Sequence, residues 1–160
     1  MFMALKLFFP FILSITLLLT GTYAAMFEDN KRLCDDANMV GCFNLGVLHM
    51  KGISGAQKDE SIALEYFRKA CNGGDIDGCL NAGKYFEEGE DVRQDLFKAV
   101  EFYTKACDGE DAYACMLLAN LYRDGKGSIQ RNIGKAIGYY QKVCEKGYSE
   151  GCKQYHNIRK

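Results

Sequence analysis

The sequence predicts an all-α fold, an α/α solenoid of stacked antiparallel helix pairs. Three observations lead to this prediction. The first is a period of 36 or 37 residues, marked by Cys42, Cys79, Cys115 and Cys152, which is typical of stacked-repeat proteins. The second is that each period contains two helical patterns of apolar residues with a short polar loop between them. The third is that proline is absent after Pro10 and that no segment has the alternating pattern of a strand.

The N-terminus predicts a cleavable secretory signal peptide. Lys6 precedes an apolar run from Leu7 to Leu19, and small residues allow cleavage after Ala24. This run is shorter than the ~20 residues that a transmembrane helix needs, although an uncleaved anchor is the alternative interpretation. We therefore divide the chain into a signal peptide, 1–24, and a repeat domain, 25–160. We expect the mature protein to be secreted or periplasmic, without a membrane attachment.

The first helix of each repeat follows a cysteine. The segments read CFNLGVLHMKG, CLNAGKYFEEG and CMLLANLYRDG, and each ends on a glycine, as helices often do. These glycines are Gly52, Gly89 and Gly125. A small residue also recurs inside each helix, at Gly46, Gly83 and Ala119. It predicts the close approach of a neighbouring helix, because an exposed glycine there would only cost stability.

The second helix of each repeat begins at a capping residue. The segments read DESIALEYFRKAC, DLFKAVEFYTKAC and NIGKAIGYYQKVC, and Asp or Asn is a favourable N-cap. The caps are Asp59, Asp95 and Asn132. Apolar spacings of three and four predict one buried face, formed by Ile62, Ala63, Tyr66, Phe67 and Ala70, and by Ala99, Phe102, Tyr103 and Ala106; Tyr139 and Tyr140 take the aromatic positions of the third repeat. Single helices before Cys34 and through Cys152 flank the three pairs, which makes eight helices.

All the cysteines fall into four pairs with the spacing C-x₇-C. In an exported protein, such a framework predicts disulfides. One scheme joins each pair locally, across the turn between a second helix and the next first helix. The other joins each first helix to its own partner, but it strands Cys34 and Cys152 at opposite ends, beyond the ~7 Å Cα reach of a disulfide. We therefore predict the local bonds Cys34–Cys42, Cys71–Cys79, Cys107–Cys115 and Cys144–Cys152.

The repeat pattern L-G-x-x-Y…G…D-x-x-x-A-x-x-Y-[YF]-x-K-A-C resembles the Sel-one-like repeat, which is related to the tetratricopeptide repeat. With C-x₇-C at every junction, residues 26–158 are similar to the Helicobacter cysteine-rich proteins of that class. Departures are local: His49 stands at the position of a consensus tyrosine, and we expect it to be a core substitute. The resemblance implies a right-handed superhelix with one disulfide per repeat and a role as a protein-interaction adaptor. For the cysteine-rich subfamily, it also implies penicillin binding and weak β-lactamase activity on or near peptidoglycan.

The residues themselves contain no catalytic motif, so the catalytic residues stay unknown. A serine β-lactamase needs a lysine three residues after its serine, and none of the serines has one. We predict no metal and no cofactor, because the two histidines, His49 and His156, lie in different repeats. The adjacent carboxylates Glu87-Glu88 and Glu110-Asp111 are interpreted as solvated surface. A net charge of -1 gives no reason to expect nucleic acid.

The predicted binding surface lies on the first helices, which in solenoids of paired helices typically line the concave face. The candidate residues alternate with the buried ones: Asn44, Val47, Asn81, Lys84, Asn120 and Arg123. Asparagine amides both donate and accept hydrogen bonds, which suits an extended peptide backbone; ordinary surface polarity is the alternative. We predict a monomer that binds a protein or peptide, either peptidoglycan-related or from a host. Hydrolysis of β-lactams or peptidoglycan fragments is the alternative function, and an antigen-like structural role is the third.

Overall fold

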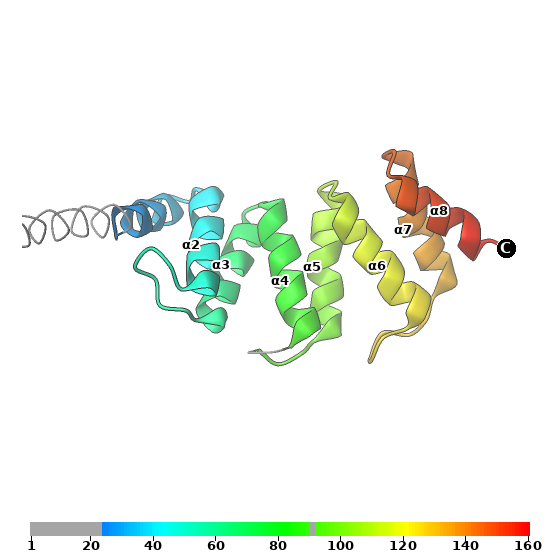
Figure 1. Ribbon diagram of the computed structural model, residues 1–160, viewed down its shortest axis with the longest axis horizontal. Helices are drawn as coiled ribbons and strands as arrows, with labels where there is room; N and C mark the ends of the chain where they lie inside the picture. Colours follow the sequence, from blue (N-terminus) through cyan, green and yellow to red (C-terminus); the bar gives the residue numbers. More distant parts are fainter. Residues whose placement is uncertain (1–23, 90–91) are drawn as a thin grey trace, which may run out of the picture.

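The computed structural model describes residues 24–89 and 92–160, which form an all-helical solenoid without strands. A helical segment, 24–35, is followed by α2 (Met39–Lys51), α3 (Glu60–Asn72), α4 (Ile76–Glu88), α5 (Leu96–Asp108), α6 (Ala112–Asp124), α7 (Ile133–Glu145) and α8 (Ser149–Ile158). The helices stand side by side along the long axis in the order of the sequence (Figure 1), and each packs chiefly on its sequence neighbour. The prediction of an α-solenoid with three helix pairs and flanking helices is confirmed.

The predicted signal peptide, 1–24, lies outside the described residues except for its last residue. In the part of the chain that the structure does describe, no helix combines the length and the apolar character needed to cross a membrane.

The predicted helix ends are confirmed by their backbone contacts. Asp59, Asp95 and Asn132 each cap a second helix, because the side-chain oxygen accepts a hydrogen bond from the backbone N–H three residues later, at 2.9 to 3.1 Å. The first helices end on glycines whose φ angles of 64°, 68° and 69° lie in the left-handed region. A residue with a Cβ is strained in this conformation, which explains why glycine recurs there.

Each first helix begins three residues before its cysteine, earlier than the sequence pattern indicated. Asn38, Asp75 and Asp111 act as N-caps, and the bonds from Gly78 N–H to Asp75 and from Ala114 N–H to Asp111 measure 2.7 and 2.6 Å. Asp111, which was interpreted as solvated surface, is half-buried, and its carboxylate satisfies a helix N-terminus. The consequence is a very short turn between the second helix of one repeat and the first helix of the next. We call this turn the hinge.

The buried face of the second helices agrees with the prediction except that Ile62 is exposed and that Tyr66 and Tyr139 are only half-buried. Ala63, Phe67, Ala99 and Tyr103 are fully buried. Ile62 is 37% exposed, and its neighbour Leu64 is buried in its place.

The half-buried aromatic residues of the second helices stack on first-helix rings. Tyr66 lies 5.7 Å from His49, and Tyr139 lies 6.0 Å from Tyr122, centroid to centroid. His49 is buried, and its Nδ1 lies 3.0 Å from the carbonyl oxygen of Gln57. The expectation that this histidine is a core residue is confirmed.

Small residues in the first helices allow the close helix contacts that were predicted. A Cβ built at Gly83 would lie 2.5 Å from the ring of Tyr103, and one at Gly46 would lie 2.7 Å from the ring of Phe67. A second such position, Gly78, precedes Cys79, and a Cβ there would lie 2.9 Å from the carbonyl oxygen of Phe67. Sequence reasoning overlooked this second position.

Each repeat carries one disulfide, as predicted. The bonds are Cys34–Cys42, Cys71–Cys79, Cys107–Cys115 and Cys144–Cys152, with Cα–Cα distances of 4.3 to 4.8 Å. No free cysteine exists in the described residues. Each bond joins the end of one helix to the first turn of the next. The first three bonds are buried, whereas both cysteines of the last bond are half-buried.

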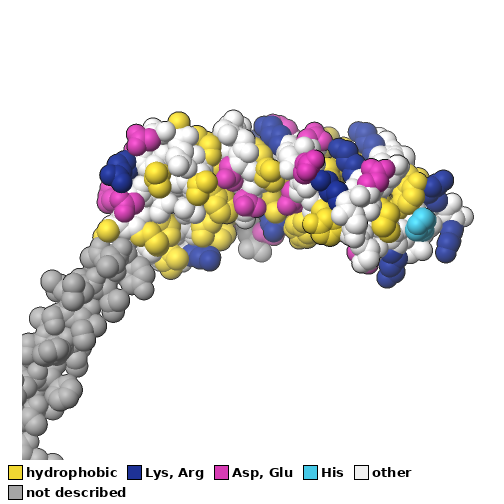
Figure 2. Space-filling view, turned by 90° about the horizontal axis from the view of Figure 1, so that it is seen from above, with side chains coloured by type: hydrophobic (Ala, Val, Ile, Leu, Met, Phe, Trp, Pro, Cys, Tyr) yellow, Lys and Arg dark blue, Asp and Glu magenta, His cyan; other side chains and the backbone are white. Residues whose placement is uncertain are grey.

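Figure 2 looks down on the hinge end of the molecule and shows several separate hydrophobic patches among side chains of both charges. Exposed apolar residues near the starts of first helices contribute to this end: Val40, Ile76, Tyr113 and Tyr148. The apolar surface at this end is thus divided among separate places.

Candidate binding groove between α4 and α6

A groove on the first helices runs between α4 and α6. It consists of two adjoining hollows of about 290 and 440 Å³, which share Glu87, Leu117 and Lys126. Other residues that line it are Lys84, Glu88, Gln94, Tyr103, Tyr113, Asn120, Leu121, Asp124 and Gly125. We call this feature the α4/α6 groove.

Glu87 is the fixed charge in the α4/α6 groove. One carboxylate oxygen accepts a hydrogen bond from the Tyr103 hydroxyl, and the other accepts one from Lys126 Nζ, each at 2.8 Å. The predicted solvated role of Glu87 is therefore wrong, since only 20% of its side chain is exposed. Burial, followed by the bond to Glu87, raises the pKa of Tyr103 far above its usual value. The hydroxyl therefore stays protonated and keeps donating.

The hydroxyl of Tyr103 offers a test of this arrangement. We expect Tyr103→Phe to lower the free energy of unfolding by about 1–2 kcal/mol, because a buried hydrogen bond to a charged group is lost. The ring itself fits, since Phe67 takes the same position in the first repeat. Tyr113→Phe is the matched control, because Tyr113 is 53% exposed. Urea denaturation measures both values, and equal stability of the two variants would contradict this account of Glu87.

Lys84 and Tyr113 form the more open wall of the α4/α6 groove. The Lys84 ammonium lies 5.0 Å from the centre of the Tyr113 ring, a cation–π distance. Lys84 has no carboxylate within ion-pair distance among residues 24–89 and 92–160. A cation and an exposed aromatic ring are thus available to a ligand at one place.

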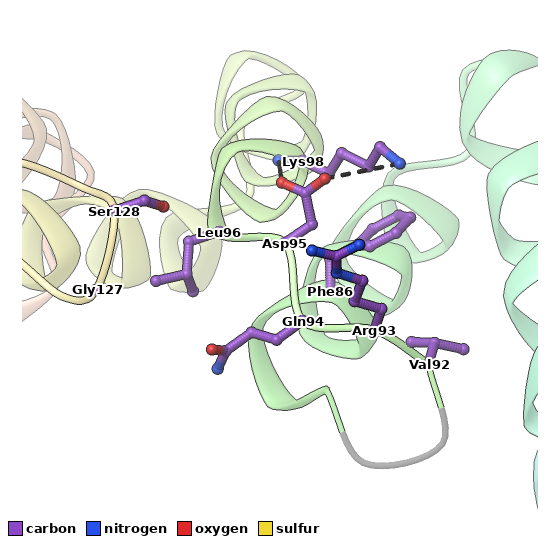
Figure 3. A pocket seen from close by; sticks show the side chains of 9 residues that line it. All are labelled: Phe86, Val92, Arg93, Gln94, Asp95, Leu96, Lys98, Gly127 and Ser128. Carbon is purple, nitrogen blue, oxygen red and sulfur yellow. Dashed lines mark hydrogen bonds and ion pairs between the residues drawn. The ribbon is translucent and has the colours of Figure 1, made fainter.

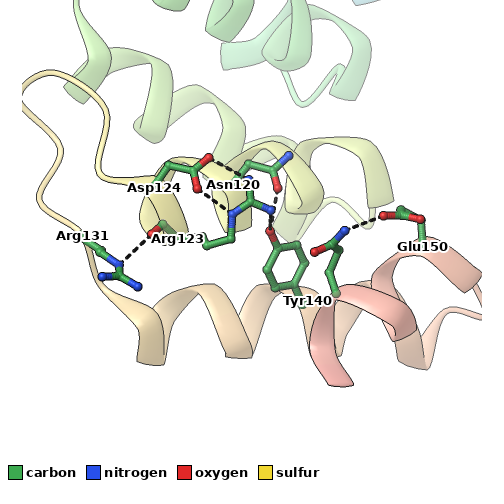
Figure 4. Close-up of polar contacts among 7 residues, drawn as sticks. Asn120, Arg123, Asp124, Arg131, Tyr140 and Glu150 are labelled. Carbon is green, nitrogen blue, oxygen red and sulfur yellow. Dashed lines mark hydrogen bonds and ion pairs between the residues drawn. The ribbon is translucent and has the colours of Figure 1, made fainter. Parts of the chain in front are cut away.

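Two other predicted residues, Asn120 and Arg123, bind Tyr140 within the molecule (Figure 4). Arg123 donates to the Tyr140 hydroxyl at 2.8 Å, and that hydroxyl donates to Asn120 at 2.6 Å. Arg123 also holds both carboxylate oxygens of Asp124, at 2.6 and 2.7 Å, and this lowers the pKa of Asp124. Most of the polar capacity of Asn120 and Arg123 is therefore used internally.

The remaining predicted residues do not share one environment. Asn44 donates to Asn30 in the helical segment 24–35 at 2.8 Å. Val47 is half-buried and packs on the core. Asn81 donates to the Asp77 carbonyl oxygen one turn earlier on α4. Of the six residues, only Lys84 and Asn120 line the α4/α6 groove. That the six bind a ligand stays a prediction.

Sequence reasoning missed Glu87, Tyr113 and Lys126 as groove residues. Lys126 lies in the loop after α6, and its contact with Glu87 spans 39 positions in the sequence. No local spacing indicates such a pair. Among the described residues, no group of histidine, cysteine, aspartate and glutamate side chains is arranged to hold a metal ion.

The family follows from the repeats themselves. The family model described as "Sel1 repeat" matches residues 40–75, 76–111 and 112–148, which is most of the chain. The chain belongs to the Sel1 repeat family. Sel1 repeats generally mediate protein–protein interactions.

Solved Sel1 repeat structures are similar in sequence as well as in fold. A Sel1 repeat protein from Oxalobacter formigenes is 26% identical, with a TM-score of 0.71 over 81% of this chain and 52% of that one. Cysteine-rich protein B of Helicobacter pylori is 28% identical, with a TM-score of 0.61 over 84% of this chain and 95% of that one. The resemblance to the cysteine-rich Sel1 repeat proteins is thus confirmed.

The curated relatives match over a shorter part. Cytochrome c oxidase assembly factor 7 of Xenopus tropicalis and factor 7A of Xenopus laevis are each 35% identical over 68 residues, or 42% of this chain. The matched part spans 29% of the length of each of these relatives.

Proposed function

We propose that this Sel1 repeat protein is exported and binds a segment of another protein in the α4/α6 groove. The observation that carries the proposal is the groove itself, in which Glu87 is bound by Tyr103 and Lys126, while the Lys84 ammonium lies over the exposed ring of Tyr113. Solenoids of stacked repeats use extended concave surfaces for binding, and the first helices are expected to line that surface here. A preorganised wall also reduces the entropy lost when a ligand binds.

Export is supported by two features. The N-terminal sequence resembles a signal peptide, and disulfides persist mainly in oxidising compartments. The proposal therefore applies to the oxidised mature chain, with a partner in the periplasm or outside the cell.

A pull-down from envelope and host extracts tests the proposed function. We expect a partner that oxidised wild-type protein captures to be lost or strongly reduced with Lys84→Ala and retained with Asn81→Ala, because Asn81 does not line the groove. Lys153→Ala on α8 is the control, because it removes a lysine charge far along the solenoid from the groove. Equal capture by all four proteins would contradict a role for the α4/α6 groove.

Hydrolysis of β-lactams is the alternative that the family resemblance raised. A chromogenic β-lactam separates the two functions. Turnover that survives extensive purification and is abolished by a single surface substitution would replace our proposal by this alternative.

A further inference from the structure

A second hollow, of about 410 Å³, lies at the loop end of the solenoid, where α5 meets the loop between α6 and α7. Its apolar lining comprises Phe97, Val100, Tyr122 and Ile129. Phe97 is 66% exposed, the largest exposed fraction among the large hydrophobic side chains of the described residues. The corresponding residues of the other second helices are Ser61 and Gly134, so the repeat fold does not require a ring there. We call this feature the loop-end hollow.

Two cations, Arg131 and Lys135, line the loop-end hollow, and no carboxylate does. Arg131 Nε donates to the Arg123 carbonyl oxygen at 3.1 Å. Lys135 Nζ lies 4.6 Å from the centre of the Tyr122 ring and 3.4 Å from its hydroxyl. Both cations are thus oriented by uncharged groups. In residues 24–89 and 92–160, neither makes an ion pair.

The surrounding carboxylates are already engaged. Asp124, whose pKa is lowered in part by Arg131, has both oxygens bound by Arg123. Glu101, one turn after Phe97, pairs with Lys105 at 3.0 Å. The two cations of the hollow therefore lack a dedicated anionic partner within the described molecule.

The adjoining hollow extends the basic character of the loop end (Figure 3). It shares Ser128 with the loop-end hollow and is lined by Arg93, Lys98 and one carboxylate, Asp95. Asp95 caps α5 and pairs with Lys98 at 3.6 Å. A local excess of positive charge thus lies on a chain whose net charge is -1.

We propose that the loop-end hollow binds an acidic segment of a partner protein. An apolar side chain of the segment lies against Phe97, and flanking carboxylates contact Arg131 and Lys135. Charge complementarity argues for an acidic ligand, and the apolar floor argues for a side chain between the carboxylates. A single exposed ring and a few charges are a weak membrane anchor, since each cation near an anionic surface contributes only about 1 kcal/mol.

Fluorescence anisotropy with two labelled synthetic peptides tests this proposal. The acidic probe is Glu-Glu-Leu-Phe-Glu-Glu, and the neutral probe is Gln-Gln-Leu-Phe-Gln-Gln. We expect the folded, oxidised protein to bind the acidic probe at least about tenfold more tightly than the neutral one, and the binding to weaken as salt is raised. Equal binding of the two peptides, or no binding of either, would overturn the proposal.

Two variants test the position of the site, and two others are controls. Phe97→Ser installs the residue of the first repeat. We expect this variant and the double variant Arg131→Gln/Lys135→Gln each to weaken binding of the acidic probe by about tenfold or more. Lys153→Gln controls for the loss of charge. Lys84→Ala should bind the acidic probe like the wild type. A failure of the proposed loop-end site can therefore be told apart from a failure of the proposed binding in the α4/α6 groove.

A membrane provides the competing explanation. Vesicles of phosphatidylcholine with a third phosphatidylglycerol form the comparison arm, and we expect them to bind no more protein than pure phosphatidylcholine vesicles do. Vesicle binding that depends on Phe97, without binding of the acidic peptide, would overturn the proposal in favour of an anionic lipid surface.

Discussion

Replacement of both Cys71 and Cys79 by alanine is expected to lower the free energy of unfolding by about 2.6 kcal/mol. This value is the chain entropy of a nine-residue closed loop, which the disulfide removes from the unfolded state. Both side chains are only 4% exposed and lie where α3 meets α4. Urea denaturation of the oxidised proteins gives the difference. A change below about 1 kcal/mol would show that the hinge is held by packing alone.

The last disulfide supplies the matched comparison. It closes a loop of the same length, but Cys144 and Cys152 are half-buried and join α8, the terminal helix, to α7. In a solenoid, where each helix packs on its neighbours, the loss of a terminal bond should loosen α8 alone. We therefore expect Cys144→Ala/Cys152→Ala to speed amide hydrogen exchange in residues 149–158 and to change the global unfolding free energy less than the Cys71/Cys79 replacement does. Equal global effects would contradict this one-dimensional view.

The architecture was predictable because its signals are local and are repeated. The caps Asp59, Asp95 and Asn132 and the glycines that end the first helices act within a few residues of their own helix, so their spacing alone specifies the elements. The early start of the first helices was missed for a physical reason. Asp75 and Asp111 lie between the two cysteines of a pair, in a stretch interpreted as a turn, and their capping bonds draw that stretch into the helix.

The α4/α6 groove was less predictable than the fold. Helical spacing identified Lys84 and Asn120 as surface residues of the first helices, and both line the groove. It did not indicate that Tyr140 would engage Asn120 and Arg123, or that Lys126 would reach Glu87 from a loop. These contacts join different helices and loops. They depend on how helices pack within a repeat and on how neighbouring repeats lie against each other, which the spacing along one helix does not encode.

The substitution of glycine by alanine at Gly83 and at Gly138 is expected to have opposite effects on stability. Both residues lie inside helices, so each change should gain about 1 kcal/mol of helix propensity. At Gly138 the new Cβ meets no atom within 4 Å, and Gly138→Ala should therefore stabilise the protein by about that amount. At Gly83 the Cβ would lie 2.5 Å from the ring of Tyr103, so the ring and α5 must shift.

The difference between the two variants isolates the cost of forcing α4 and α5 apart. Overpacking of a well-filled core costs about 1–3 kcal/mol, and Tyr103 has little room to move because it is fully buried and its hydroxyl is bound to Glu87. We therefore expect Gly83→Ala to be less stable than Gly138→Ala by about that amount in urea denaturation. It should also weaken whatever binds the α4/α6 groove, because the ring that must move holds Glu87 in place. If the two variants were equally stable, the small residues of the first helices would not set the helix spacing, and the geometry of the groove would have to come from the hinges alone.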